Sequence, residues 1–193
     1  VDDDTSRDLM GQIAAIKATL AVVAHYDPEE GSRQSRRALE LLQADNRAFR
    51  SRATWTLGYA HQLQGDRARA RQIFTEAMRQ ASGNSYHTLL ASASLAQIQE
   101  SENELHQAAE SYMRSLQFVG DQAQLSASEE NVGLARIFYE WNDLDAAEKH
   151  GEMSLQMARR YHRSIDRFIA SEVLLARVKL TLGDTAGAAA MLA

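Results

Sequence analysis

The chain has 193 residues, of which 45% are apolar and 24% charged, and a formal net charge of −5. The absence of cysteine excludes disulfides, thiol catalysis and cysteine-based zinc sites. The acidic balance argues against direct contact with nucleic acid, and no apolar run reaches the roughly 18 residues of a membrane span. We therefore expect a cytoplasmic protein with neither a nucleic-acid partner nor a membrane segment.

Helices are predicted along the whole chain, and no stretch shows the apolar alternation of a strand. The one proline, Pro28, is well placed for the first turn of a helix. In chain order, the predicted helices pair into hairpins over 7–25 and 28–43, 48–64 and 67–81, 85–101 and 104–118, 124–141 and 144–161, and 164–182 with 185 onward.

A motif that recurs about every forty residues supports this pairing. Gly or Asn followed by an acid marks each turn, because Gly and Asn tolerate a left-handed backbone and the acid caps the next helix. Small residues on both helices allow close approach, and Phe74 and Tyr112 provide larger contacts. On the first helix of each hairpin the motif positions are Leu57-Gly58, Leu95-Ala96, Leu134-Ala135 and Leu175-Ala176. The turns are Gly65-Asp66, Asn103-Glu104, Asn142-Asp143 and Gly183-Asp184, and the small residues of the second helices are Ala70, Ala108, Ala147 and Ala188. A fainter first copy includes Asp27.

This period predicts an all-α protein, an α-solenoid of tetratricopeptide-like hairpins that forms a right-handed superhelix. We expect one domain over 1–193, a fragment of a longer protein with about five hairpins, the last incomplete. Such an end would expose apolar side chains and favour self-association. The side chains expected to be exposed are Leu174, Leu175, Val178, Leu182 and Met191.

Motifs of catalysis are missing from the sequence, which contains no phosphate-binding loop, no HExxH and no GxSxG. None of the six histidines lies three or four residues from another, so we expect no metal site and no cofactor. His61 is interpreted as a packed, hydrogen-bonded histidine, and the protein is not expected to be an enzyme.

A binding groove is predicted on the inner face of the superhelix, along the first helix of each hairpin. Aromatic planes and forked donors there suit a peptide or a sugar-like ligand, whether a small-molecule inducer or a partner protein. The alternative is that Trp55 and Tyr59 only pack between hairpins, while Trp141 fixes the turn that follows it. The candidate groove residues are Arg52, Trp55, Tyr59, Gln62, Gln97, Arg136, Tyr139 and Arg177.

The stretch FYEWNDLDAAEKH, residues 138–150, resembles the tetratricopeptide-like sensor region of bacterial LuxR-type regulators of the MalT kind. Segments 53–81 and 151–160 are similar to the same region. The resemblance implies a signal-transducing ATPase whose nucleotide-binding module precedes this region and whose DNA-binding domain follows it. The region would then sense an inducer or partner and control self-association. A peptide-binding scaffold unconnected with transcription remains the alternative.

Overall fold

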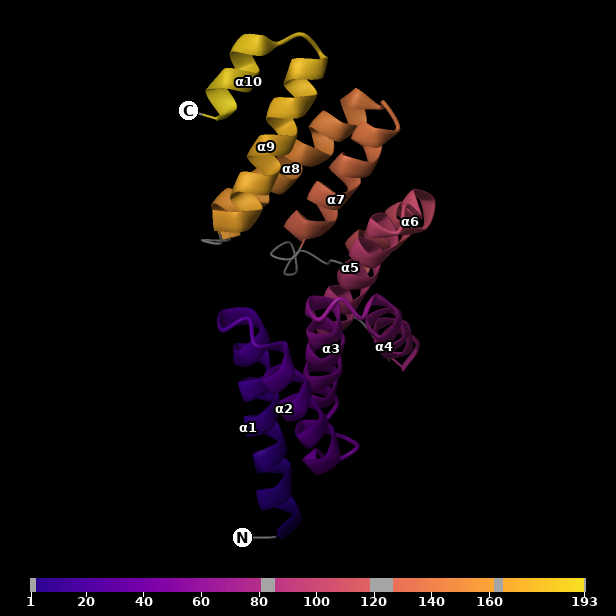
Figure 1. Cartoon of the computed structure of the whole chain (residues 1–193), viewed down its shortest axis with the longest axis vertical. Coiled ribbons are helices and arrows are strands. Elements are labelled where there is room, and N and C mark those ends of the chain that lie inside the picture. The colour runs from indigo at the N-terminus through magenta and orange to yellow at the C-terminus, as the bar shows by residue number, and fades with distance from the viewer. Residues whose placement is uncertain (1–2, 81–85, 119–126, 162–164, 193) are drawn as a thin grey trace. The chain divides into compact units, whose positions relative to one another are not determined.

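The computed structural model describes residues 3–80, 86–118, 127–161 and 165–192, and the regular structure of these segments is entirely helical (Figure 1). In the part described, the predicted and observed helices correspond one to one, and the predicted ends at 81, 85, 124 and 164 lie outside it. The helices are α1 Asp3–Ala24, α2 Pro28–Leu41, α3 Arg47–Leu63, α4 Arg67–Gln80, α5 Tyr86–Ser101, α6 Leu105–Phe118, α7 Ala127–Glu140, α8 Leu144–Tyr161, α9 Ile165–Thr181 and α10 Thr185–Met191.

The chain groups into two compact units, residues 1–98 and 99–193, which divide within α5. We call them the N-terminal unit and the C-terminal unit and describe each by itself. The prediction of a single domain stays a prediction.

The left-handed turns predicted between the helices of a hairpin are confirmed. Gly65 and Gly183 have φ of 80° and 85°, and Asn103 and Asn142 have φ of 62° and 58°. Tyr26 holds the same position in the first hairpin, with φ of 52°. A tyrosine seldom adopts this conformation. Because the position holds neither Gly nor Asn, the sequence does not mark the first turn as it marks the later ones.

At four of the turns, the acid caps the following helix, as the motif predicts. The carboxylates of Asp27, Asp66, Asp143 and Asp184 each accept a hydrogen bond from the backbone N–H three residues on, at 2.8–3.1 Å. Pro28 occupies the first turn of α2. These caps satisfy N–H groups that a helix start leaves without partners, and they fix where each second helix begins.

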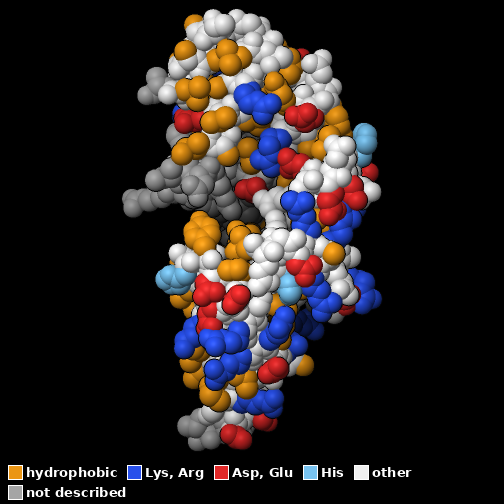
Figure 2. Space-filling model, viewed as in Figure 1, with side chains coloured by type: hydrophobic (Ala, Val, Ile, Leu, Met, Phe, Trp, Pro, Cys, Tyr) orange, Lys and Arg blue, Asp and Glu red, His pale blue; other side chains and the backbone are white. Residues whose placement is uncertain are grey.

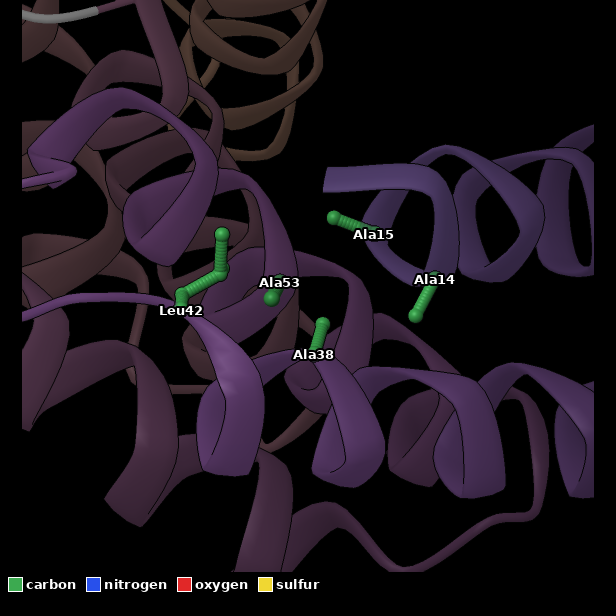
Figure 3. Close-up of a cluster of buried hydrophobic side chains, with 5 residues drawn as sticks. All are labelled: Ala14, Ala15, Ala38, Leu42 and Ala53. Atoms are coloured by element: carbon green, nitrogen blue, oxygen red, sulfur yellow. The ribbon is translucent and has the colours of Figure 1, made fainter. Parts of the chain in front are cut away.

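Small side chains fill the core of the N-terminal unit. Ala14, Ala15, Ala38, Leu42 and Ala53 bring α1, α2 and α3 together in one cluster (Figure 3). Alanine pairs let helix axes approach closely, so this cluster depends on backbone proximity more than on large side chains.

A second cluster in the same unit contains Phe74, which is fully buried. A Cβ atom added to Gly58 would lie only 2.5 Å from Cε1 of Phe74, so the ring occupies the space that glycine leaves on α3.

The outer surface is charged: Figure 2 shows Lys and Arg side chains gathered on the lower part of the visible face, and α2 exposes Arg33, Arg36 and Arg37.

In the C-terminal unit, a glycine again leaves room for a large ring of a neighbouring helix. The fully buried ring of Tyr112 on α6 lies against Gly133 of α7, where a Cβ atom would clash with it. Ser128, Ser154 and Ser171 join α7, α8 and α9 through buried hydroxyl hydrogen bonds of 2.8 and 3.2 Å.

The sequence-based expectation about the last hairpin is wrong for three residues. Leu174, Leu175 and Val178 are all buried, at 4%, 1% and 0% exposure. Their side of α9 faces other helices of the unit: Leu175, for example, packs where Gly151 leaves room on α8. Of the other two, Leu182 is 48% exposed and Met191 is half-buried. Among the described residues of α9, the large apolar side chains of Ile169, Val173 and Leu180 are also exposed.

Candidate functional site

Trp55 and Tyr59, the two predicted groove aromatics of α3, stack on each other with ring centroids 5.3 Å apart. Both are half-buried and pack against the cluster that contains Phe74, and Nε1 of Trp55 donates a hydrogen bond to Oγ of Ser94 at 3.3 Å. These contacts favour the alternative interpretation, in which the pair joins α3 to α5.

The remaining predicted residues of the N-terminal unit also contact their neighbours. Gln62 donates from Nε2 to Oε1 of Gln97 at 3.4 Å, which again connects α3 to α5. The guanidinium of Arg52 lies 5.6 Å from the ring centre of Phe49. Burial, together with the positive charge of Arg52, lowers the pKa of His87 to about 4.

In the C-terminal unit, Arg136 forms a two-point ion pair with Glu100. Its Nε and Nη2 donate to the two carboxylate oxygens at 2.6 and 2.9 Å, and the hydroxyl of Tyr112 donates to the same carboxylate at 3.2 Å. Burial raises the pKa of Tyr112, and the charge of Glu100 adds to that effect. Burial alone would lower the pKa of Arg136, but the hydrogen bonds and charge of Glu100 raise it.

Tyr139 and Arg177 are in direct contact. The guanidinium carbon of Arg177 lies 4.7 Å from the centre of the Tyr139 ring, within the range of a cation–π interaction. The hydroxyl of Tyr139 hydrogen-bonds to Oγ1 of Thr181 at 3.1 Å. Within the described part of the chain, the exposed Arg177 guanidinium makes no hydrogen bond or ion pair, so its N–H donors face solvent.

These side chains line a cavity of about 240 Å³ in the C-terminal unit. The structure thus brings together three of the predicted site residues, Arg136, Tyr139 and Arg177, whereas the other five belong to the N-terminal unit. The cavity combines guanidinium groups, an aromatic ring, carboxylates and leucine side chains. This combination suits a polar ligand with an apolar part. The remaining lining residues are Glu100, Asn103, Leu105, Ile137, Glu140 and Leu174.

Sequence reasoning missed the groove positions of the first hairpin. The two hairpins can be aligned on the left-handed residues of their turns, Tyr26 and Gly65, which are 39 positions apart. On this alignment, the α3 positions Arg52, Trp55, Tyr59 and Gln62 correspond to four apolar residues of α1, namely Ile13, Ile16, Leu20 and Val23. All four are exposed, by 46%, 42%, 52% and 52%. The signal was Asp27, which lies 39 positions before Asp66, but the copy of the motif is faint there, because Tyr26 stands where the later turns have Gly or Asn.

Trp141 lies at the end of α7 and contacts aromatic rings on both sides. Its ring centroid is 4.8 Å from that of His106 at the start of α6 and 5.7 Å from that of Phe138. Phe138 in turn stacks on His150 of α8, 5.4 Å away. Trp141 therefore packs beside the turn, as the sequence predicts, and connects it to the preceding hairpin.

His61 differs in part from its prediction. It is half-buried, but its Nδ1 has no hydrogen-bond partner among the described residues and lies 3.5 Å from a carboxylate oxygen of Asp66. In the segments that the structure describes, no cluster of His, Cys, Asp and Glu is arranged to hold a metal ion, and no helix has the length and apolarity to cross a membrane.

Comparison with known proteins gives matches to one family and to solved structures. The family described as "MalT-like TPR region" matches residues 11–193. The crystal structure of BtubC (BKLC) from P. vanneervenii superposes with a TM-score of 0.78 at 16% identity, covering 98% of this chain and 79% of that one. A putative kinesin light chain of Podosopora anserina, with nearly identical TPR-like repeats, gives a TM-score of 0.64 at 15% identity, over 100% and 94%.

No curated protein is a significant match to the sequence. The structural neighbours share the fold alone, and they confirm the predicted class of tetratricopeptide-like helical repeats. The family match extends over nearly the whole chain, and the chain belongs to the family of MalT-like TPR regions.

Proposed function

We propose that this chain is the sensing and protein-interaction region of a bacterial LuxR/MalT-type transcription regulator in the cytoplasm. A ligand bound to its groove would control activation or self-association, without catalysis and without a cofactor. The observation that carries the proposal is the family match over residues 11–193.

The cavity of the C-terminal unit supports a ligand-binding role. Arg177 presents its donors from a fixed position, because its planar group lies on the ring of Tyr139. The neighbouring pair of Arg136 and Glu100 is already satisfied, so it shapes the wall more than it attracts charge. An inducer with hydroxyl or carboxylate groups, or a polar peptide side chain, would fit these donors.

The test uses the full-length protein that contains this chain, with a transcriptional reporter and the candidate inducers. Arg177→Ala and Tyr139→Phe should each reduce the response at least tenfold. Arg114→Ala removes an exposed arginine from α6, away from the cavity, and should leave the response unchanged. The melting temperature of each variant should stay within about 2 °C of the parent, because Arg177 and Arg114 are exposed and Tyr139→Phe keeps the half-buried ring.

An unchanged response in both cavity variants would contradict the assignment of the cavity. Trp55→Ala is unsuitable as a test of binding, because Trp55 packs against the buried cluster and hydrogen-bonds to Ser94. Loss of its ring would destabilise the N-terminal unit whether or not a ligand binds there.

A peptide-binding scaffold unconnected with transcription is the second candidate. It is favoured by the two structural neighbours, of which one is named a putative kinesin light chain and neither a regulator. The flanking sequence of the gene distinguishes the two. A nucleotide-binding loop upstream and a helix-turn-helix downstream would support the regulator, and flanks without either would support the scaffold.

A further inference from the structure

One face of α1 is apolar and exposed over most of its length. We call Leu9, Ile13, Ile16, Leu20 and Val23 the α1 stripe; they are 55%, 46%, 42%, 52% and 52% exposed. The opposite face of the helix is buried in the core, through alanines such as Ala14 and Ala18. The stripe is therefore not part of the hairpin packing, and an exposed apolar row of this size marks an interaction surface.

The spacing of the stripe indicates the shape of its partner. Its residues are separated by four, three, four and three positions, which is the alternation that a helix presents to another helix in a coiled coil. The described part of the chain is helical throughout its regular structure, so it offers no strand edge to which a partner could add a strand. A helix laid along α1 would pack its own apolar residues between those of the stripe.

The charges around the stripe indicate the polar flanks of that partner. From Leu9 to Ala24 the only charged residue is Lys17. The neighbouring α3 contains no Asp or Glu and carries Arg52 at the position that corresponds to Ile13, whereas the guanidinium of Arg50 donates to the backbone carbonyls of Leu39 and Leu42. The acids of α1, which are Asp3, Asp4 and Asp8, all precede the stripe. The charges nearest to it in this pattern, Lys17 on α1 and Arg52 on α3, complement Asp and Glu and disfavour Lys and Arg.

We propose that the α1 stripe docks an amphipathic helix of a partner protein whose apolar face is flanked by Asp and Glu. The stripe occupies the groove positions of the first hairpin, and the inference rests on the proposed role of this chain in protein interaction. It deepens that role by naming the partner's structure and charge. It is separate from the ligand cavity, which lies in the C-terminal unit.

The proposal is tested first with synthetic peptides against the whole chain, by fluorescence anisotropy. One peptide carries about three heptads with Leu at the a and d positions and Glu at e and g. A second has Lys at e and g, and a third is the Glu peptide with two central prolines that prevent a helix. The Glu peptide should bind at least tenfold more tightly than either of the other two. Equal binding of the Glu and Lys peptides would overturn the proposal.

Variants then locate the binding surface. Ile13→Gln combined with Leu20→Gln should weaken binding of the Glu peptide at least tenfold. The matched control, Leu182→Gln combined with Leu192→Gln, changes leucines of the C-terminal unit that are 48% and 63% exposed, and should change it less than twofold. Circular dichroism confirms that both variants are folded, as expected for exposed positions. Equal affinity of the two variants would overturn the proposal.

Two further measurements identify the occupant of the stripe and distinguish the stripe from the ligand cavity. If sedimentation shows a dimer that dissociates in the Ile13→Gln/Leu20→Gln variant and the peptide does not compete, the occupant is a second copy and the proposal fails. Arg177→Ala should leave peptide binding intact even where it abolishes the inducer response. If Arg177→Ala leaves the inducer response unchanged while the Ile13→Gln/Leu20→Gln variant still weakens peptide binding, the ligand cavity has been assigned wrongly. If that double variant leaves peptide binding unchanged while Arg177→Ala still abolishes the inducer response, the α1 stripe has been assigned wrongly.

Discussion

Glu100 holds two neighbouring side chains through a single carboxylate. It accepts two hydrogen bonds from Arg136 of α7 and one from Tyr112 of α6. Both partners of the ion pair are largely buried, with side chains 20% and 34% exposed. Such a pair depends on each member, because removing one charge leaves the other desolvated.

Glu100→Gln should therefore destabilise the protein. A neutral amide accepts more weakly and cannot offset the charge of Arg136, so the free energy of unfolding should fall by about 1–3 kcal/mol in urea denaturation. Glu110→Gln removes an exposed carboxylate of α6 and should change it by less than about 0.5 kcal/mol. Equal stability of the two variants would show that the ion pair does not hold these helices.

His87 should make stability depend on pH. Its pKa is lowered from 6.5 to about 4, mainly by burial, so the unfolded chain takes up the proton first. Stability contributed by the neutral ring is complete above pH 6.5 and decreases as pH falls toward 4. Since the ring is only part-buried, we expect a loss of about 1 kcal/mol between pH 7.5 and 5.

The comparison of His87→Gln with His25→Gln checks this origin by urea denaturation at both pH values. The first change should flatten the pH dependence of the unfolding free energy. The second removes an exposed histidine and should preserve the dependence. A pH dependence that survives His87→Gln would assign it to other groups, such as His150, whose pKa is also lowered by burial.

At the scale of the helices, glycine and a large ring determine how closely two axes approach. Gly58→Ala would normally favour a helix by about 1 kcal/mol, but its Cβ would lie 2.5 Å from Phe74. We expect a net destabilisation of about 1–3 kcal/mol from overpacking. In the double variant with Phe74→Leu, Gly58→Ala should cost much less, because the smaller side chain leaves room. An equal cost in both backgrounds would rule out the clash.

The helix limits could be predicted because each depends on local chemistry. A Gly or Asn that accepts positive φ and an acid that caps the next helix are readable in sequence at four turns. The first turn could not be read fully, since Tyr26 adopts φ of 52° without being a residue type that favours it. The groove positions of α1 were missed with it, although the 39-residue spacing to Asp27 was present.

For the whole molecule, interactions between hairpins join residues about one repeat apart. Thr19 and Thr56 are 37 positions apart, Glu100 and Arg136 are 36, and Tyr139 and Thr181 are 42. In a repeat protein, stability is close to a sum over neighbouring repeats, so a local change has local effects.

Gly58→Ala should accordingly speed amide hydrogen exchange in α3 and α4 more than tenfold. Exchange in α7, α8 and α9 should change less than twofold, because these helices share no side-chain contact with Gly58 or Phe74 in the described segments. Mass spectrometry of exchange in the parent and the variant checks this. A uniform acceleration along the chain would instead indicate cooperative unfolding of the whole protein.

The sequence by itself determined the class of the protein and its helices, because periodicity and turn chemistry are local. Only the tertiary structure decided what the predicted groove positions contact. Trp55 and Gln62 pack or hydrogen-bond toward α5, Tyr139 and Arg177 line a cavity, and Leu20 is exposed. The same position in successive repeats has different neighbours, and burial depends on those neighbours, which lie about forty residues away in the chain.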